Sequence, residues 1–338
     1  MESINNNIFD HRHYADISRL VELKKKKGLT ISLAFPTLNE ENTIGAEIEI
    51  IRRTLVQQYQ LLDEVAVIDS GSTDKTRDIA RYVGADVYLA SDILPELGEA
   101  VGKGENLWKS IYVLKSDIIV WADADIENFH TKFVYGLVGP LLERDDLMFT
   151  KAFYERPLAV GGDLLGFGGG RVTEILVRPI FGCFYPELSV MFQPCAGEYA
   201  GRRELLEKLP FATGYGVETG LLIDIFERYG LDVIGQVNLD KRIHRNQDLE
   251  GLGKMSFEIL HAFVQRLQKN GKIDLNSEMQ KQFIRADLSD HGIDVCKERV
   301  QIGDRPPMTS IPSYKEQRKS CKGWSWSDTG KRLKIVSV

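Results

Sequence analysis

The sequence contains no long apolar run, no excess of basic residues and no closely spaced cysteine pairs. A transmembrane helix needs about 20 apolar residues, so we expect no integral membrane contact. Residues 1–7 lack the basic start and apolar stretch of a signal peptide. The cysteines show no metal-binding spacing, which is typical of reduced thiols in a cytoplasmic protein; they are Cys183, Cys195, Cys296 and Cys321. A net charge of -6 argues against nucleic acid as a partner, because phosphate binding requires a basic face.

The 338-residue chain is long enough for one large domain with an extension. Residues 1–28 read as an N-terminal arm with a short helix that ends at Gly28. The basic run at residues 24–27 is then the solvated end of this helix, although membrane contact is an alternative. From about Asp304 the prolines and polar residues favour a poorly packed tail or a segment that wraps a partner.

Apolar segments and helical patterns alternate through the first half of the chain. This order predicts an α/β fold with a mostly parallel sheet flanked by helices. Strands are expected at 31–35, 64–68, 117–122, 147–154 and 231–237. Helices are expected at 44–58, 73–82, 103–115, 217–228 and 256–269.

Polar segments follow three of these strands: 36–41, 69–74 and Asp123-Ala124-Asp125. The carboxyl ends of parallel strands meet at one edge of a sheet, where α/β proteins bind ligands. Two carboxylates one residue apart offer hard oxygen ligands to Mg²⁺ or Mn²⁺ holding a diphosphate. Taken alone, each segment is equally compatible with a solvated turn, and Gly102-Lys103-Gly104 with a simple helix start.

The three segments together resemble the GT-A glycosyltransferases, which use nucleotide sugars. Further motifs narrow the resemblance to the retaining glucosyl-3-phosphoglycerate synthases, close to the mannosyl-3-phosphoglycerate synthases. They are Gly169-Gly170-Arg171-Val172-Thr173-Glu174, Gly214-Tyr215-Gly216-Val217-Glu218 and Arg242-Ile243-His244-Arg245-Asn246. The resemblance runs from about residue 34 to about residue 267. It implies a GT-A catalytic domain at 29–250, with a donor-binding half at 29–130 and an acceptor-binding half at 131–250.

The resemblance also implies roles for individual residues. The metal, Mg²⁺ or Mn²⁺, would be held by Asp125 and His244. Catalysis would involve Glu218, Asp123 and Lys103. The nucleotide-sugar donor would contact Pro36, Thr37, Leu38, Glu40, Asp69, Ser70, Lys103, Asp123, Ala124, Glu218 and Arg242. The acceptor, 3-phosphoglycerate, would contact Gly170, Arg171, Val172, Thr173, Tyr215 and Asn246.

Elementary chemistry supports several of these roles, although each residue also has a purely structural explanation. A glycine-rich turn that opens a helix offers free N–H groups to an anion, and Arg171 adds a planar fork. Composition alone leaves a surface loop as the alternative. Glu218 begins a helix, where the dipole favours an acidic residue in any case. A lone histidine such as His244 is more often a packed or exposed side chain than a ligand.

The implied reaction transfers glucose with retention from UDP-glucose or GDP-glucose to the 2-hydroxyl of 3-phosphoglycerate. Retention proceeds either through a carboxylate nucleophile, for which Glu218 is the candidate, or by attack of the acceptor on the face that the diphosphate leaves. Three rival functions remain open. They are mannose transfer from GDP-mannose, transfer to a polyprenyl phosphate at a membrane, and nucleotide binding without catalysis.

Residues 251–338 are expected to form a helical C-terminal extension with a tail. The family tends to form homodimers, and this extension is the natural dimer element. Its segment 257–264 is apolar on more than one face, which indicates a buried helix. Burial inside the monomer explains this pattern equally well.

Overall fold

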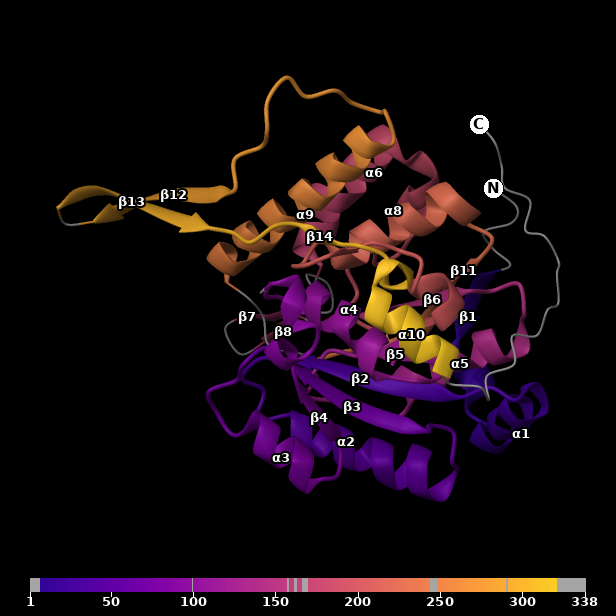
Figure 1. Cartoon of the computed structure of the whole chain (residues 1–338). Coiled ribbons are helices and arrows are strands. Elements are labelled where there is room, and N and C mark those ends of the chain that lie inside the picture. The colour runs from indigo at the N-terminus through magenta and orange to yellow at the C-terminus, as the bar shows by residue number, and fades with distance from the viewer. Residues whose placement is uncertain are drawn as a thin grey trace.

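An eight-stranded sheet forms the centre of the computed structural model, which describes residues 7–98, 100–156, 158–160, 163–165, 170–243, 248–289 and 291–320. The strand order is β1-β11-β6-β9-β5-β2-β3-β4, with helices on both faces (Figure 1). The strands are β1 (Ile8–Asp10), β2 (Ile31–Thr37), β3 (Glu64–Asp69), β4 (Asp86–Leu89), β5 (Ile118–Trp121), β6 (Phe149–Glu155), β9 (Tyr199–Arg202) and β11 (Ile234–Lys241). All neighbours pair in parallel except at β9, which runs antiparallel to β5 and β6. The predicted α/β class is therefore confirmed.

Alternating side chains divide the sheet between two hydrophobic cores, as the two-residue period of a strand requires. In β2, Leu33 and Phe35 join one core, whereas Ala34 faces the other. The first core packs against α1 (Ile17–Lys27), α2 (Ile44–Ile51), α3 (Thr76–Tyr82) and α5 (Lys132–Glu143). The second packs against α4 (Lys103–Val113), α6 (Arg178–Phe184), α7 (Arg203–Leu206), α8 (Val217–Tyr229), α9 (Leu249–Lys269) and α10 (Pro312–Ser320).

Short elements complete the chain. Pairs of strands outside the main sheet are β7 (Leu158–Val160) with β8 (Asp163–Leu165), β10 (Phe211–Ala212) with β14 (Asp304–Arg305), and β12 (Gln282–Ser289) with β13 (Gly292–Arg299). Single turns of 3₁₀-helix are η2 (His11–Tyr14), η4 (Ala90–Asp92), η5 (Pro95–Leu97), η7 (Pro186–Val190) and η8 (Met308–Ser310). Wider π-helical turns occur at η3 (Arg52–Gln58), which continues α2, and at η6 (Thr173–Val177).

The N-terminal segment packs into the sheet instead of standing apart as an arm. Strand β1 pairs with β11 at the sheet edge, and Leu20 of α1 is buried. Gly28 ends α1 with a φ of 64°, as expected. The basic run is only partly solvated, because the Lys24 ammonium is buried and lies 2.7 Å from Asp63. The domain boundaries at residues 28 and 250 stay predictions.

The expectation of a poorly packed tail from Asp304 is wrong for the part that the structure describes. Strand β14 pairs with β10, and Met308 and Tyr314 are buried. The Trp108 indole donates to the carbonyl of Pro306 at 2.8 Å. We call residues 304–320 the C-terminal strap. Its buried apolar side chains pack against the rest of the domain. Residues 321–338 lie outside the described residues.

The C-terminal extension contains the expected long helix, which begins earlier than predicted, at Leu249. Asp248 caps it by accepting a hydrogen bond from the N–H of Gly251 at 2.8 Å. The extension also contains a hairpin, β12–β13, that the sequence analysis did not anticipate and that projects from the body (Figure 1). Among the described helices, none is both long and apolar enough to cross a membrane.

We predict that Gly104→Ala destabilises the fold, because α4 meets β10 without room for a side chain. A Cβ at Gly104 would lie 1.7 Å from the Ala212 carbonyl oxygen. Overpacking of this kind costs roughly 1–3 kcal/mol. The free energy of unfolding in denaturant measures the loss. The matched control is Gly182→Ala in α6, where a Cβ meets nothing within 4 Å. We expect that control to gain up to about 1 kcal/mol, and equal effects at both sites would contradict the prediction.

Candidate active site

The carboxyl ends of β2, β3, β5, β6 and β11 lie at one edge of the sheet, because these strands are mutually parallel. A cavity of about 790 Å³ opens at this edge. Residues that follow all five strands line it, together with the start of α4, η6 and parts of α8, α9 and β13. The polar segments that the sequence places at strand ends therefore meet where an α/β sheet binds ligands.

Asp69 organises the loops that follow β2 and β3. Its carboxylate is fully buried and accepts hydrogen bonds from the N–H groups of Gly71 and Ser72 at 3.0 and 2.8 Å. The Thr37 hydroxyl donates to the same carboxylate at 2.9 Å. Neighbouring Ser70 reaches the cavity wall, whereas the Asp69 carboxylate lies beneath it. Asp69 thus holds the two loops together, and we infer that it acts on a ligand only through them.

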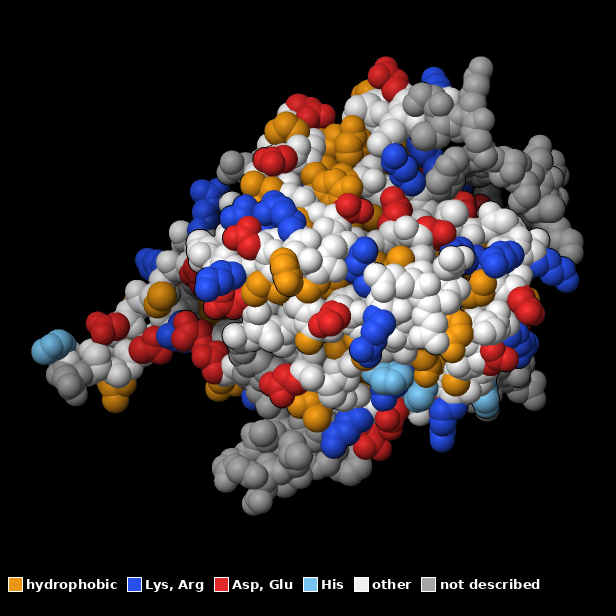
Figure 2. Space-filling view, turned by 90° about the horizontal axis from the view of Figure 1, so that it is seen from below, with side chains coloured by type: hydrophobic (Ala, Val, Ile, Leu, Met, Phe, Trp, Pro, Cys, Tyr) orange, Lys and Arg blue, Asp and Glu red, His pale blue; other side chains and the backbone are white. Residues whose placement is uncertain are grey.

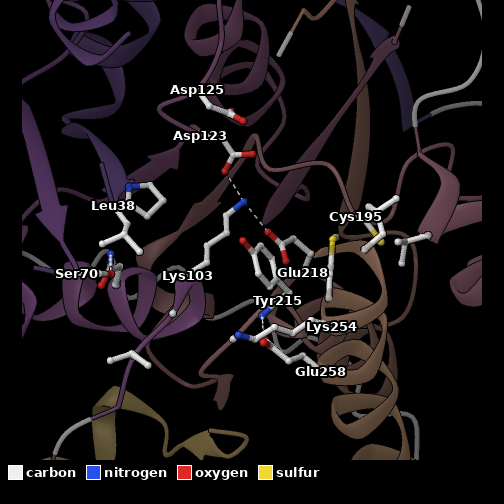
Figure 3. Close-up of a pocket in the computed structure, with 18 of the residues that line it drawn as sticks. Leu38, Ser70, Lys103, Asp123, Asp125, Cys195, Tyr215, Glu218, Lys254 and Glu258 are labelled. Atoms are coloured by element: carbon white, nitrogen blue, oxygen red, sulfur yellow. Dashed lines mark hydrogen bonds and ion pairs between the residues drawn. The ribbon is translucent and has the colours of Figure 1, made fainter. Parts of the chain in front are cut away.

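Lys103 and Arg242 form ion pairs with three carboxylates at the centre of the cavity. Lys103 extends from the first turn of α4 to Asp123, with which it forms a short ion pair, and to Glu218 at 2.8 Å (Figure 3). Arg242 lies 3.0 Å from Asp123 and 2.8 Å from Asp125. Four elements of the fold therefore converge on a single charged cluster: α4, the end of β5, α8 and the end of β11.

Burial and neighbouring charge set the ionisation of this cluster. Burial raises the pKa of Asp123, but Lys103 and Arg242 outweigh it and hold that pKa well below its usual range. Burial lowers the pKa of Lys103, yet Asp123 and Glu218 raise it overall above its ordinary value. Asp125 differs, because burial raises its pKa and Arg242 only partly opposes the rise. The cluster therefore keeps Asp123 ionised and Lys103 charged.

Gly197 makes room for the Asp123 carboxylate. A Cβ at position 197 would lie 1.9 Å from the carboxylate oxygen Oδ2. A glycine just before β9 therefore lets the backbone pass directly behind the acidic group. Any larger residue would push Asp123 out of its contacts with Lys103 and Arg242.

The donor atoms at this edge fit a hard divalent cation. Asp123 and Asp125 present carboxylate oxygens to the cavity. Glu47 lies behind them, where its Oε1 accepts from the N–H of Ile126 at 2.9 Å while its buried Oε2 has no partner. Within the described ranges, no three His, Cys, Asp or Glu side chains are arranged so that together they could hold a metal ion. His244, the expected further ligand, lies outside them.

Comparisons with known proteins identify the family of this chain. A family model described as Glycosyl transferase family 2 matches residues 32–160. A glucosyl-3-phosphoglycerate synthase of Petrotoga mobilis is 54% identical over 309 residues, which are 91% of this chain and 95% of that protein. This chain belongs to the glucosyl-3-phosphoglycerate synthase family.

Solved structures agree with this assignment of the family. A glucosyl-3-phosphoglycerate synthase from Mycobacterium tuberculosis, crystallised with Mn²⁺, UDP and phosphoglyceric acid, superposes with a TM-score of 0.76 at 42% identity, covering 87% of this chain and 94% of that one. A mannosyl-3-phosphoglycerate synthase from Rubrobacter xylanophilus superposes with a TM-score of 0.85 at 34% identity, covering 92% and 99%. The GT-A fold expected from the sequence is thereby confirmed.

The cavity brings together most residues to which the synthase family's motifs assign a role. Its wall includes these predicted donor, metal and catalytic residues: Pro36, Thr37, Leu38, Glu40, Ser70, Lys103, Asp123, Ala124, Asp125, Glu218 and Arg242. It also includes the predicted acceptor residues Gly170, Arg171, Val172, Thr173 and Tyr215. His244 and Asn246 lie outside the described residues. The individual roles stay predictions.

Other wall residues of this synthase were missed by the sequence analysis. Asn106 of α4 donates to the Ser70 hydroxyl at 2.8 Å, and Glu258 of α9 accepts from the N–H of Tyr215 at 2.8 Å. The remainder are Val101, Arg156, Cys195, Leu252, Lys254, Met255, Glu298, Arg299, Val300 and Gln301. Of these, Arg156 could have been found, since it lies two residues after the predicted strand at 147–154. The wall residues on α9 and β13 belong to no sequence motif that would have pointed to the cavity.

A buried lysine beneath the synthase site gives the fold a testable pH dependence. Burial lowers the pKa of Lys151 to about 8. Its ammonium donates to the carbonyl of Ala196 at 2.5 Å and lies 4.1 Å from the ring centroid of Tyr199. Between pH 8 and 10.5 the unfolded state binds a proton at this lysine that the folded state lacks, so stability rises with pH across this window.

We therefore predict that Lys151→Met abolishes this rise. The stability of wild type relative to the variant should increase from pH 8 to 10.5 by roughly 3 kcal/mol. Denaturant unfolding across this pH range measures the difference. Lys25→Met, at an exposed position of α1, is the control and should leave the pH dependence unchanged. A constant difference between wild type and Lys151→Met would show that the buried ammonium does not titrate in this range.

Proposed function

We propose that this chain transfers glucose, with retention, from a nucleotide sugar to the 2-hydroxyl of 3-phosphoglycerate. The observation that carries the proposal is that the predicted donor motifs and the predicted acceptor motifs line one cavity. The loops after β2, β3 and β5 and the turn Gly170–Thr173 line the same cavity. Support comes from the M. tuberculosis enzyme, whose structures were solved with UDP-glucose and phosphoglyceric acid.

A divalent cation belongs to this proposal. The M. tuberculosis structures contain Mn²⁺ or Mg²⁺ together with UDP. In this chain Asp125, with His244 as the expected second ligand, would hold the ion, and the carboxylates at the cavity suit either metal. A bound cation would offset the negative charge of the donor diphosphate.

The residues of the chain supply the remaining chemistry. Lys103 places a positive charge beside Asp123, where it can neutralise charge that develops on the leaving diphosphate. Glu218, held at 2.8 Å from Lys103, is positioned to bind the hydroxyls of the transferred sugar. We favour attack by the acceptor hydroxyl on the face that the diphosphate leaves, with the departing phosphate oxygen taking its proton. A trapped glucosyl–Glu218 ester would rule this route out.

A second donor is favoured by one specific observation. The mannosyl-3-phosphoglycerate synthase of R. xylanophilus covers 92% of this chain with a TM-score of 0.85. GDP-mannose is therefore the alternative donor to UDP-glucose. GDP-glucose shares its base with the first and its sugar with the second. The acceptor is the same in either case, so the choice depends on contacts to the base and to the sugar.

We predict that nucleoside diphosphate release requires both 3-phosphoglycerate and a divalent cation. The purified protein is mixed with UDP-glucose, GDP-glucose or GDP-mannose, and released diphosphate is measured with and without EDTA. The donor with the highest kcat/KM identifies the enzyme. Lack of acceptor-dependent release with every donor would overturn the proposal, and polyprenyl phosphates would then be tested as acceptors.

We also propose that the protein is a homodimer built on the hairpin β12–β13. Cross-strand pairing places Ile284, Ala286 and Leu288 on one face of the hairpin beside Val295 and Ile293. The other face is anchored, because Phe283 packs on Phe257 of α9 with ring centroids 5.6 Å apart. The apolar face is open, with Leu288 89% and Ile293 72% exposed, and the hairpin protrudes freely (Figure 2). A second copy of this chain offers the same apolar face in return.

The dimer predicts a specific response to charge on this face. Leu288→Lys combined with Ile293→Lys should lower the mass in solution from dimer to monomer, measured by light scattering after gel filtration. Asp294→Lys, on the opposite face of the same strand, is the matched control and should remain dimeric. A wild type that is monomeric at every concentration would contradict the proposal, as would a double variant that stays dimeric.

The compartment we propose is the cytoplasm. In the described part of the chain the cysteines Cys183, Cys195 and Cys296 are all free, which is typical of a reducing environment. A nucleotide sugar and 3-phosphoglycerate as partners agree with this compartment.

A further inference from the structure

The proposed acceptor carries two anionic groups beside the atom that reacts. In 3-phosphoglycerate the 2-hydroxyl is bonded to a carbon that also bears the carboxylate, and the phosphate is one carbon further away on the other side. An acceptor site must therefore bind two anions at once, one of them next to the transferred sugar. The inference below rests on the proposed function and deepens it.

The described wall of the cavity contains six basic side chains, and most are already engaged. Lys103 and Arg242 pair with the carboxylates of the central cluster, and Lys254 forms an ion pair with Glu298. Arg171 belongs to the glycine-rich turn that we assign to the acceptor phosphate. The remaining two are Arg156 and Arg299, of which Arg299 lies on the exposed strand β13.

Arg156 is a partly buried cation without an acidic partner in the described ranges. Its Nη2 donates to the Tyr154 hydroxyl at 2.8 Å, and its guanidinium carbon lies 5.0 Å from the centroid of that ring. Its Nε is buried and has no hydrogen-bond partner. The Tyr154 hydroxyl in turn donates to Glu198 at 2.5 Å and accepts from Arg242 at 3.2 Å. A neutral phenol thus holds Arg156 in place; Asp123 feels its charge, but no carboxylate of the described residues forms an ion pair with it.

Such an arrangement is costly unless an anion completes it. A buried donor without a partner loses the free energy of its hydration, and more is lost when the donor is charged. A guanidinium fork matches a carboxylate in shape and charge. The free Nε is one of the donors that such a fork uses. Arg156 is therefore prepared to bind an anionic ligand from the cavity.

The sheet order places Arg156 on the side of the reaction centre away from the donor loops. The donor loops follow β2 and β3, on one side of β5 and Asp123. Arg156 follows β6, which lies on the other side of β5 with β9 between them. Arg242 follows β11, the next strand beyond β6, and still reaches Asp123. The end of β6 is thus close to the reacting centre and remote from the nucleoside loops.

We propose that Arg156 binds the carboxylate of the glycerate acceptor, while Arg171 and the turn around it bind the phosphate. The two arginines then hold the acceptor at both ends and present the 2-hydroxyl between them. A cation next to the carboxylate also makes the enzyme select acceptors in which an acid flanks the reacting hydroxyl.

The test compares two ligands that differ only at the proposed contact. Glycerol 3-phosphate retains the phosphate and the 2-hydroxyl of 3-phosphoglycerate but has a hydroxymethyl group in place of the carboxylate. The Michaelis constant for the acceptor and the inhibition constant for glycerol 3-phosphate are measured at saturating donor. Both are determined for wild type, Arg156→Ala, Arg156→Lys and Arg171→Ala. Thermal melts confirm that each variant is folded.

We expect Arg156→Ala to weaken the binding of 3-phosphoglycerate roughly 10- to 100-fold. The same variant should leave the inhibition constant for glycerol 3-phosphate and the Michaelis constant for the donor within about twofold of wild type. Arg156→Lys should recover part of the loss, because it keeps the charge without the fork. Arg171→Ala should weaken both ligands, since both contain the phosphate.

Two results would overturn the assignment of Arg156 while leaving the proposed function intact. One is an equal loss for the two ligands, which would indicate a structural role. The other is a raised Michaelis constant for the donor, which would place Arg156 at the diphosphate. If wild type fails to use 3-phosphoglycerate with any donor, the proposed function fails and this assignment fails with it.

Discussion

Charge balance at Asp123 is the constraint on which the site depends. One carboxylate is shared between the ammonium of Lys103 and the guanidinium of Arg242, and these cations also hold Glu218 and Asp125. Each partner comes from a different element, so the cluster exists only when the sheet and the helices α4 and α8 are in place. Removing one partner of a buried pair typically costs about 3–5 kcal/mol, because the other charge is left unpaired. Binding chemistry and stability are therefore carried by the same side chains.

A second set of contacts fixes the helix that carries Lys103. Arg305 of β14 holds both oxygens of Glu105, at 2.7 and 2.8 Å, and donates to the carbonyls of Leu97 and Gly98. The N–H of Glu105 donates to the carbonyl of Thr213, whose own N–H donates to Gly303. The first turn of α4 is thus enclosed between β10 and the C-terminal strap. The strap gives the C-terminal segment a direct part in shaping the cavity.

The sequence was sufficient for the parts of the site that depend on local patterns. An apolar strand followed by turn-forming residues identified the loops after β2, β3 and β5, and glycines around Lys103 identified the start of α4. Asp69 was assigned to the ligand because its position at a strand end is visible, whereas its burial beneath the loop is a tertiary property. Glu258 was missed because it meets the N–H of Tyr215 only through the packing of α9 on α8.

The C-terminal region was the hardest to anticipate, for a physical reason. Prolines and polar residues near Asp304 favour a poorly packed tail, but Pro312–Ser320 is helical and the apolar side chains of Met308 and Tyr314 are buried. The hairpin β12–β13 mixes charged and apolar residues, so neither strand stands out by composition. His244 and Asn246 lie outside the described residues, and their part in the site stays a prediction.

The contact between Arg305 and Glu105 spans 200 residues of sequence. A chain made from its N-terminus can form the loops after β2, β3 and β5 long before the residue that fastens α4 has been synthesised. Until then nothing from the strap holds the first turn of that helix. The cavity therefore takes its final shape only near the end of synthesis, so a prematurely terminated chain keeps the loops after β2, β3 and β5 but lacks the Arg305 contact at the start of α4.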